Sequence, residues 1–409
     1  MRQCTRSIAL MLAALWAAPA AAQPAAPDPT ALTLEAAFAR AASANPVMAA
    51  ARARQSAALA AVGTARERPN PELHVEYTRE TPTQAYTLSL PVETSGKRAR
   101  RIALGDAGVL VSGAEQVRTA FELRVAVRAA YFDLVAARAR LDLLREVAQI
   151  ATRAKDAAEQ RFAAGDVARL EVLQADLARG DAENQMAAAD GAAAAAAVRL
   201  RTLLAWPADT PLSLATSIDA DVDRAVAAPG AAEPTRHADI AVLDAQVEEQ
   251  KARIAVASSL RVPDLTPEVA VTRGAEPEFT TGWRAGLAVT LPIFTRHDAA
   301  VRTEEATLAA VTADRAATLA RVGGDVAAAS AQVEALAQQY RRYQSTLVPQ
   351  AVEIERLADD AYRLGRTGIG AYLQALQASR DIRLRMLQTA ADFQIARADL
   401  ERALGAPLP

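Results

Sequence analysis

Long stretches of this chain carry apolar side chains at helical spacing. From about residue 97 to residue 160 the sequence has no proline, and apolar residues recur at spacings of three, four and seven. They include Phe121, Val125, Leu134, Leu141, Leu144 and Val147. This pattern predicts one sustained helix. At 1.5 Å per residue, roughly 60 residues extend about 90 Å, far beyond the diameter of about 30 Å of a small domain, so this helix needs neighbouring helices.

The same pattern predicts further long helices over residues 167–205, 296–357 and 369–404. Pro349 should kink or interrupt the second of these, because proline cannot donate a backbone hydrogen bond. The alanine run at residues 192–197 is expected to mark a close helix contact, with low-complexity sequence as the alternative. The helices therefore form two long hairpins, with tips near residues 161–167 and 362–368.

Four short segments alternate apolar with polar or small side chains, as strands do. Leu73, Val75 and Tyr77 alternate with polar residues in the first segment, and Trp283 begins the last. The expected strands are residues 73–78, 85–91, 267–273 and 283–291. One apolar face and a bordering aromatic residue favour transmembrane β-barrel strands, which have about 9–11 residues. Hairpins packed on a helix are the alternative.

Four strands are too few for a closed barrel. Bacterial outer-membrane barrels need at least about 8 strands, and an open edge in lipid leaves backbone groups without hydrogen bonds. Several chains must therefore contribute, and three copies related by cyclic symmetry would supply twelve strands. The expected fold is mainly α with a small β part, in which very long coiled-coil helices accompany four strands of a trimeric transmembrane barrel.

The order of elements occurs twice, at an offset of about 200 residues. The segment from Arg161 aligns with the segment from Ala361, and Leu90-Pro91 aligns with Leu291-Pro292. Each half reads helix, two strands, very long helix, turn and long helix. We therefore expect a first structural repeat over residues 23–206, a linker over 207–234, and a second repeat over 235–409.

Residues 1–22 have the features of a cleaved secretory signal peptide. Two arginines precede an apolar run from Ile8 to Ala18, and three alanines end the segment. The run is too short to span a bilayer, which requires roughly 20 residues. The only cysteine, Cys4, lies near the start of the signal, so neither a lipid anchor nor a disulfide is expected in the mature chain.

Composition and residue spacing offer little support for catalysis or nucleic-acid binding. The formal net charge of -2 is not biased toward nucleic acid or an anionic membrane surface. His74, His237 and His297 lie in different segments without metal-ligand spacing, so no metal site is expected. No phosphate-binding loop or nucleophile motif occurs. We expect neither an enzyme nor a bound cofactor.

Three features together are similar to one known family. They are the duplicated helix-strand-strand-helix plan, the paired tips at Gly165 and Gly365, and the segment between strand and helix that carries Pro91, Glu93 and Gly96. Across nearly the whole mature chain they resemble the TolC family of outer-membrane efflux proteins, specifically its heavy-metal (CzcC-like) branch. The resemblance implies an outer-membrane homotrimer in contact with lipid, whose barrel continues into a periplasmic helical tunnel.

The resemblance also implies partners and cargo. A periplasmic adaptor protein would join the tunnel to an inner-membrane RND-type pump, and the channel would be a passive conduit for small substrates. Heavy-metal cations are favoured; drugs or type I secretion of a polypeptide are alternatives. A periplasmic coiled-coil adaptor or structural rod would share the long helices but would not need duplicated strands. An enzyme or solute-binding protein would need a deep polar pocket.

Candidate site residues follow from the resemblance and from local chemistry. Phe162 and Tyr362 should present apolar surface beside glycines that end each helix, and a plain hairpin turn is the alternative. The expected adaptor-docking residues are Arg161, Phe162, Gly165, Asp166, Tyr362, Gly365, Arg366 and Thr367. Glu171 and Gln374 are candidates for a constriction, although the family's acidic pattern is incomplete here.

A third candidate region lies between barrel and tunnel. It comprises Pro91, Glu93, Gly96, Lys97, Arg98 and Pro292. Arg100 and Arg101 extend the positive charge at the start of the long helix, where it opposes the helix dipole. A solvated run of charges is the expected explanation, and a role at the barrel-to-tunnel junction is the alternative.

Overall fold

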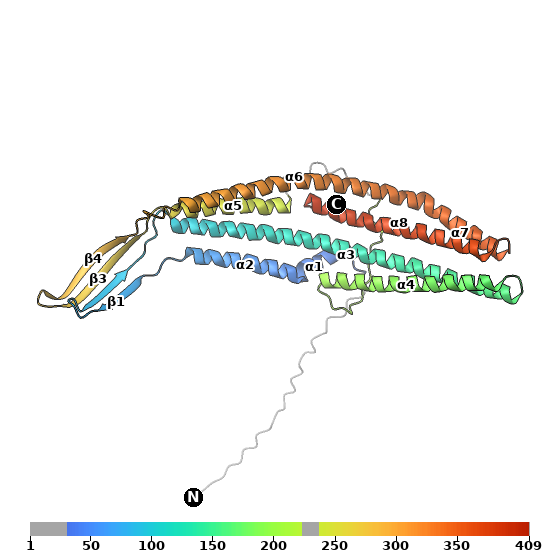
Figure 1. Cartoon of the computed structure of the whole chain (residues 1–409), viewed down its shortest axis with the longest axis horizontal. Coiled ribbons are helices and arrows are strands. Elements are labelled where there is room, and N and C mark those ends of the chain that lie inside the picture. Colours follow the sequence, from blue (N-terminus) through green and yellow to red (C-terminus); the bar gives the residue numbers. More distant parts are fainter. Residues whose placement is uncertain (1–30, 223–236, 409) are drawn as a thin grey trace, which may run out of the picture.

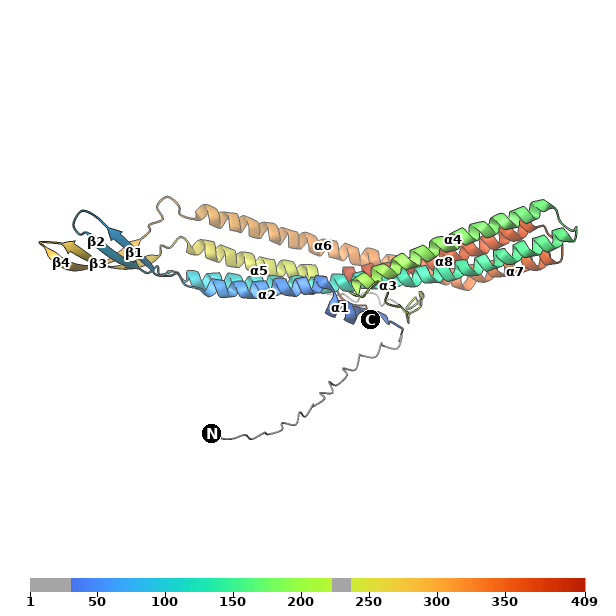
Figure 2. The same cartoon turned by 90° about the horizontal axis from the view of Figure 1, so that it is seen from below.

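The computed structural model describes residues 31–222 and 237–408. The protein is elongated, with a β-sheet at one end and two helical hairpin tips at the other (Figure 1). Figure 2 shows α2, α5 and α6 on the sheet side of the molecule and α4, α7 and α8 on the tip side. The predicted signal peptide and the second part of the predicted linker lie outside the described residues.

Each half contains a helix, two strands and a long helical hairpin, and a short helix precedes the first half. The first half consists of α1 (Leu34–Ala44), α2 (Pro46–Arg66), β1 (Glu72–Tyr77), β2 (Gln84–Ser89), α3 (Lys97–Ala163) and α4 (Arg169–Leu203). The second consists of α5 (Ala238–Ser259), β3 (Leu265–Ala275), β4 (Phe279–Val289), α6 (Asp298–Arg342), η2 (Tyr343–Leu347), α7 (Val348–Arg363) and α8 (Ile369–Leu404).

The longest helices of the two halves differ in continuity. α3 runs unbroken for 67 residues. Its counterpart is interrupted by the five-residue π-helical segment η2, directly before α7, whose first turn contains Pro349. Proline lacks the N–H that would continue the helix ladder, and the π turn absorbs this defect. The predicted interruption at Pro349 is thus confirmed.

The four strands form one antiparallel sheet in the order β1-β2-β3-β4. β2 and β3 join the two halves, with Thr87 opposite Ala270. β1 and β2 have six residues each, fewer than the 11 of β3 and β4. Pairing continues beyond β2, because Val92 exchanges backbone hydrogen bonds with Leu265. β1 and β4 are the two open edges of the sheet within the described chain.

The main hydrophobic core lies about halfway along the molecule, where helices of both halves meet. α1, α3, α4, α6 and α8 bury large side chains there, including Tyr131, Leu134, Leu200, Phe393 and Leu400. Alanines of the 192–197 run belong to this core and its neighbour, which confirms the predicted close helix contact. Alanine is the most frequent buried residue in the smaller clusters toward the tips.

A buried ion pair crosses this core. Arg128 of α3 and Glu401 of α8 are 3.1 Å apart, and both side chains are almost fully buried. Burial lowers the pKa of Arg128, and the charge of Glu401 partly offsets that effect. A pair of this kind fixes the relative position of two helices, because either charge alone would be costly in the interior.

Within residues 31–222 and 237–408, no helix is both long enough and apolar enough to cross a membrane.

Candidate functional site

Both hairpin tips turn through the same backbone motif. Gly165 and Gly365 have positive φ angles of 85° and 68°, in the left-handed region that glycine tolerates best. The amide of Asp166 donates to the carbonyl of Arg161 at 2.9 Å, and that of Gly165 donates to Phe162 at 2.9 Å. The second tip repeats both bonds at corresponding residues. These are Schellman caps, so each long helix ends where its glycine permits.

The aromatic residues of the two tips occupy different environments. Phe162 is 46% exposed, whereas Tyr362 is only 1% exposed. The ring of Tyr362 stacks on Tyr372 of α8, with centroids 5.6 Å apart and planes 6° from parallel. Alanines of α3 and α4 and Ile369 complete the cluster. The expectation that Tyr362 presents apolar surface is therefore wrong, because the returning helix and the first hairpin cover it.

Burial also changes the acidity of the two stacked tyrosines. Burial and the nearby charge of Glu171 raise the pKa of Tyr362. Burial, followed by the charges of Asp359 and Glu355, raises the pKa of Tyr372 to about 12. Both phenols are therefore neutral at physiological pH, and their rings act as packing groups.

Arg161 connects the two tips. Its Nη1 donates a hydrogen bond to the carbonyl oxygen of Tyr362 at 3.1 Å. Its guanidinium carbon lies 5.0 Å from the centroid of the Tyr362 ring, within the range of a cation–π contact. The structure thus brings Arg161 and Tyr362 together and gives Arg161 a structural contact within the chain.

The remaining predicted tip residues, Asp166, Arg366 and Thr367, are exposed. The surface of the tips also includes apolar residues that sequence reasoning missed: Leu170, Leu173, Leu177 and Leu364. Three of them lie on α4 at spacings of three and four, a signal visible in the sequence but absorbed there into the helix pattern. An exposed apolar stripe on α4, the helix that follows the Phe162 tip, is a feature of contact surfaces.

The two candidate constriction residues have different surroundings. Glu171 is half-buried, and its Oε1 lies 3.7 Å from the position that a β-carbon on Gly368 would take. Gln374 is exposed. Glu171 therefore lies against the second tip rather than in open solvent. A role for either residue in a constriction stays a prediction.

The segment before α3 is a tightly bonded junction. Ser95 and Gly96 both have positive φ angles, which turn the chain from the sheet into the helix. Lys97 is buried, and its Nζ lies 2.8 Å from Oδ1 of Asp264, just before β3. The same oxygen accepts a hydrogen bond from the Thr94 amide at 2.9 Å. Lys97 thus ties the first half to the second where sheet and helices meet.

The neighbouring arginines bind the ends of other helices. Arg98 donates to the carbonyl oxygen of Arg66 at 2.8 Å, and Arg101 donates to that of Glu67 at 3.0 Å and pairs with Glu93. Arg100 donates to Ala255 near the end of α5 at 3.0 Å. Cations stabilise helix C-termini. The expected solvated charge run is therefore wrong: the cluster caps α2 and contacts α5.

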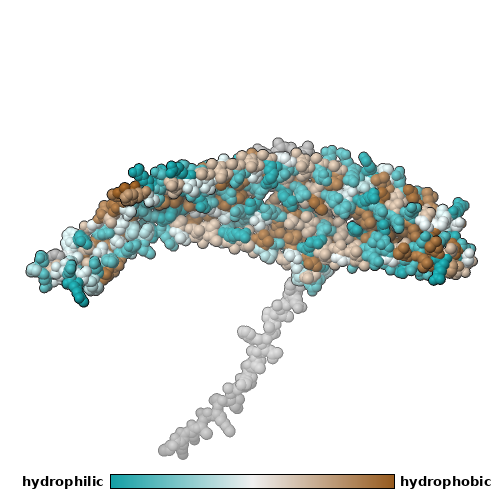
Figure 3. Space-filling view, in the orientation of Figure 1, coloured by the Kyte–Doolittle hydropathy of each residue, from teal (hydrophilic) through white to brown (hydrophobic). Residues whose placement is uncertain are grey.

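Pro91 and Pro292 are both half-buried at the two transitions from strand to helix. The second transition carries residues that the sequence reasoning missed. Phe294 is 99% exposed, and Ile293 and Leu291 are also exposed. Figure 3 shows hydrophobic surface where the sheet meets the helices and again toward the tips. The Leu-Pro-Ile-Phe run was visible in the sequence, but alternation alone did not reveal its exposure.

The described residues contain no group of three or more His, Cys, Asp or Glu side chains that could hold a metal ion. His74, His237 and His297 belong to β1, the start of α5 and the start of α6. The polar groups described above at the tips and around the start of α3 act as helix caps and ion pairs.

Comparison with known proteins gives consistent matches over the length of the chain. A family model described as outer membrane efflux protein matches residues 38–205 and 234–406. The cobalt-zinc-cadmium resistance protein CzcC of Cupriavidus metallidurans is 27% identical over 386 residues, covering 91% of this chain and 90% of CzcC.

Solved structures share the fold. One is CusC, whose crystal structures concern conformational changes that accompany folding and transmembrane channel formation. It superposes with a TM-score of 0.77 at 17% identity, and the match covers 91% of this chain and 92% of CusC. The outer membrane protein VceC of Vibrio cholerae has a TM-score of 0.74 at 17% identity, covering 92% of this chain and 97% of VceC. The predicted architecture of long helices with a small β part is thus confirmed.

Proposed function

This chain belongs to the outer membrane efflux protein family, and we propose that three copies of it form one channel through the outer membrane and the periplasm. As a member of that family it is an outer-membrane efflux channel with a periplasmic helical portion. Members of the family are channels rather than enzymes. The alternatives of a periplasmic adaptor or a structural rod are set aside, because the family match spans the strands as well as the helices.

The observation that carries the trimer is the pair of open sheet edges. β1 pairs with β2 and β4 pairs with β3, which leaves one free edge on each side of the described sheet. In lipid, backbone groups at such edges need partners. If β4 of one copy pairs with β1 of the next, three copies close a barrel of twelve strands. Exposed apolar side chains such as Leu73, Trp283 and Leu287 then face lipid.

Each copy would contribute two repeats to this assembly, over residues 23–206 and 235–409, joined by the linker 207–234. The two helical hairpins of each copy would then give twelve helices around a periplasmic tunnel. The channel would act as a passive conduit without catalysis or a bound cofactor, because its contribution is a shaped, water-filled path.

The hairpin tips are the proposed docking site for a periplasmic adaptor protein that connects the channel to an inner-membrane RND-type pump. Support comes from the exposed apolar side chains around Phe162, Leu170, Leu173 and Leu364. Asp166, Arg366 and Thr367 would provide polar contacts at the rim of this surface, as in other interfaces.

Heavy-metal cations are the proposed cargo. The support is the 27% identity to a cobalt-zinc-cadmium resistance protein over nearly the whole of both chains. The absence of a metal cluster in the described residues is compatible with this cargo, since a conduit need not bind its substrate tightly.

Assembly is tested by native mass spectrometry of the detergent-extracted mature protein from outer membranes. The mature chain should have a mass slightly below the 43.1 kDa of the full chain. A trimer should have close to three times the mass of one mature chain. A monomer that needs no detergent would overturn the shared barrel.

Cargo is tested by deleting the gene from its host and restoring it on a plasmid. Loss and recovery of tolerance to Co²⁺, Zn²⁺ and Cd²⁺, with unchanged tolerance to a drug panel, is the expected result. Sensitivity to drugs alone, or loss of a secreted polypeptide, would overturn the metal cargo while leaving the channel in place.

The tip variant Phe162→Ala distinguishes adaptor docking from channel assembly, because it should assemble normally.

A further inference from the structure

Two helix junctions lie at about the same level, halfway along the molecule. α4 ends near the beginning of α2, and α8 ends near the beginning of α5 (Figure 1). At each junction one buried side chain bonds the end of one helix and the beginning of the other. That side chain is Asn45 in the first half and His237 in the second. The two junctions therefore have the same geometry and different chemistry.

Asn45 forms the first junction without any titratable atom. Its Oδ1 accepts from the Val47 amide at 2.8 Å, which caps the beginning of α2. Its Nδ2 donates to the carbonyl of Leu203 at 2.8 Å, which satisfies the end of α4. The side chain is 4% exposed, so water cannot easily replace either bond.

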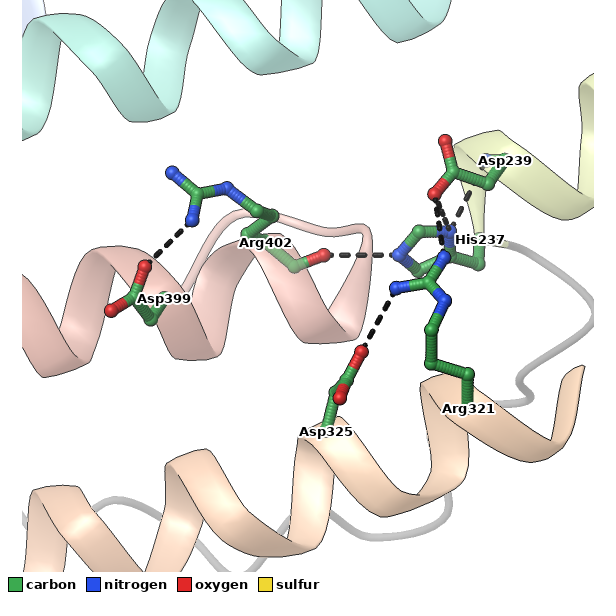
Figure 4. A network of polar contacts seen from close by, with 6 residues as sticks. All are labelled: His237, Asp239, Arg321, Asp325, Asp399 and Arg402. Carbon is green, nitrogen blue, oxygen red and sulfur yellow. Dashed lines mark hydrogen bonds and ion pairs between the residues drawn. The ribbon is translucent and has the colours of Figure 1, made fainter. Parts of the chain in front are cut away.

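His237 makes the same two bonds with its ring nitrogens (Figure 4). Nδ1 lies 3.1 Å from the amide nitrogen of Asp239, and Nε2 lies 3.0 Å from the carbonyl oxygen of Arg402. An amide can only donate and a carbonyl can only accept. Nδ1 must therefore be unprotonated and Nε2 must carry the hydrogen, which assigns the neutral ring in one tautomer.

The ring is held closely on its other side. His237 is 6% exposed, and a β-carbon on Gly405 would lie 2.9 Å from both Cα and Cδ2 of His237. Only glycine, with its φ of 64°, therefore fits at the end of α8 against this ring. A change of partner by His237 must consequently disturb the junction.

Charged residues of α5, α6 and α8 lie near the ring. From α5, Oδ2 of Asp239 lies 3.8 Å from Nδ1. From α6, Arg321 pairs with Asp239 at 3.4 Å and with Asp325 at 3.0 Å. From α8, Asp399 pairs with Arg402 at 2.7 Å. These residues line a cleft of about 690 Å³, which Asp392 also lines.

The helix dipoles do not decide the charge of the ring. The beginning of α5 disfavours a cation and the end of α8 favours one, so the two effects oppose each other. The hydrogen bonds decide it instead. A proton on Nδ1 would face the N–H of the Asp239 amide, so two hydrogen-bond donors would oppose each other. The Asp239 carboxylate is close enough to accept a hydrogen bond from that proton after a small movement.

We propose that His237 forms a pH-sensitive hydrogen-bonded link between the end of α8 and the beginning of α5. Histidine is the side chain whose charge commonly changes between about pH 8 and 5. When His237 is neutral it caps both helices. When the ring gains a proton, Nδ1 no longer accepts the hydrogen bond of the Asp239 amide and pairs with the Asp239 carboxylate instead. That carboxylate then gives up its ion pair with Arg321. The beginning of α5 then loses its cap, whereas the Asn45 junction keeps both bonds at every pH in this range.

The test is hydrogen–deuterium exchange of the full-length mature protein in detergent at pH 7.5 and 5.5, with rates corrected for the intrinsic effect of pH. A lost cap of typical strength corresponds to about a fivefold change in opening. Peptides that cover the start of α5 should lose about fivefold protection at the lower pH. Peptides that cover the start of α2 should not change, and they serve as the internal control.

The matched variant is His237→Asn, which copies the first junction. It should remove the pH response at α5 without lowering protection at pH 7.5. If this variant does not assemble, the wild-type comparison still decides, because equal pH responses at α2 and α5 would overturn the proposal. A second variant, Asp239→Asn, should shift the response to lower pH by removing the acceptor for the protonated ring; an unshifted response would contradict the exchange of partners.

Discussion

At the first hairpin tip Phe162 lies partly in solvent, whereas at the second tip the corresponding Tyr362 is buried against Tyr372. Both tips nevertheless share the same glycine, the same positive φ and the same pair of capping hydrogen bonds. The backbone turn therefore does not determine the surface that a tip presents. That surface depends on which side of each hairpin the other hairpin covers.

The two tips therefore have different roles, although their sequences align. The second tip contributes the buried ring that holds α3, α4, α7 and α8 together at this end. The first tip contributes Arg161, which reaches across to the second, and an exposed aromatic residue. Substitutions at matched positions should accordingly have unequal effects.

The largest expected effect is that of Tyr362→Ala. Removal of a large buried ring from a packed cluster costs about 3 kcal/mol, and the stacked partner Tyr372 would lose its contact. Hydrogen exchange of the α7–α8 hairpin should report this loss as a lower free energy of local opening.

The matched control for that substitution is Phe162→Ala, which should change local stability by no more than about 0.5 kcal/mol because the ring is exposed. It should instead reduce export that depends on the adaptor. Equal destabilisation by the two substitutions would show that the tips are packed alike.

A smaller effect is expected from Gly165→Ala and Gly365→Ala. A β-carbon in the left-handed region costs about 1–2 kcal/mol, and both glycines have positive φ. The two losses should be similar, because neither position places a β-carbon closer than 3.5 Å to a neighbouring atom. Thermal unfolding of each variant, beside Gly→Asn variants that tolerate this conformation better, measures the difference. A loss at only one glycine would mean that the turns are not equivalent.

A smaller free energy than that of the glycine substitutions is expected for the contact between Arg161 and the ring of Tyr362. The coupling free energy should be about 0.5–1 kcal/mol, as is usual for a cation–π contact near the surface. A double-mutant cycle that combines Arg161→Gln with Tyr362→Leu isolates this energy. The result is checked with Arg366→Gln, which alters an exposed charge at the other tip and should show no coupling. Zero coupling for Arg161 would assign its role to the backbone hydrogen bond alone.

Periodicity within the sequence was sufficient for the long helices and the strands, and the motifs that resemble the family lie between and within them. Apolar spacing along residues 97–160 has one interpretation because only a helix repeats at that interval, and Pro349 can only interrupt a helix at that place. Gly165 and Gly365 could be placed at helix ends because few other residues adopt a positive φ there without strain.

Only the tertiary structure decided what each side chain contacts. Aligned positions such as Phe162 and Tyr362 differ in burial because the hairpins pack asymmetrically, and no local pattern encodes that packing. The arginines in the first turns of α3 looked like a solvated charge run. Their partners are instead carbonyls at the end of α2 and near the end of α5, more than 30 residues away in the chain. His237 and Asn45 share a role across dissimilar residue types for the same reason: helix ends that meet in space require a donor and an acceptor, and the sequence does not show which ends meet.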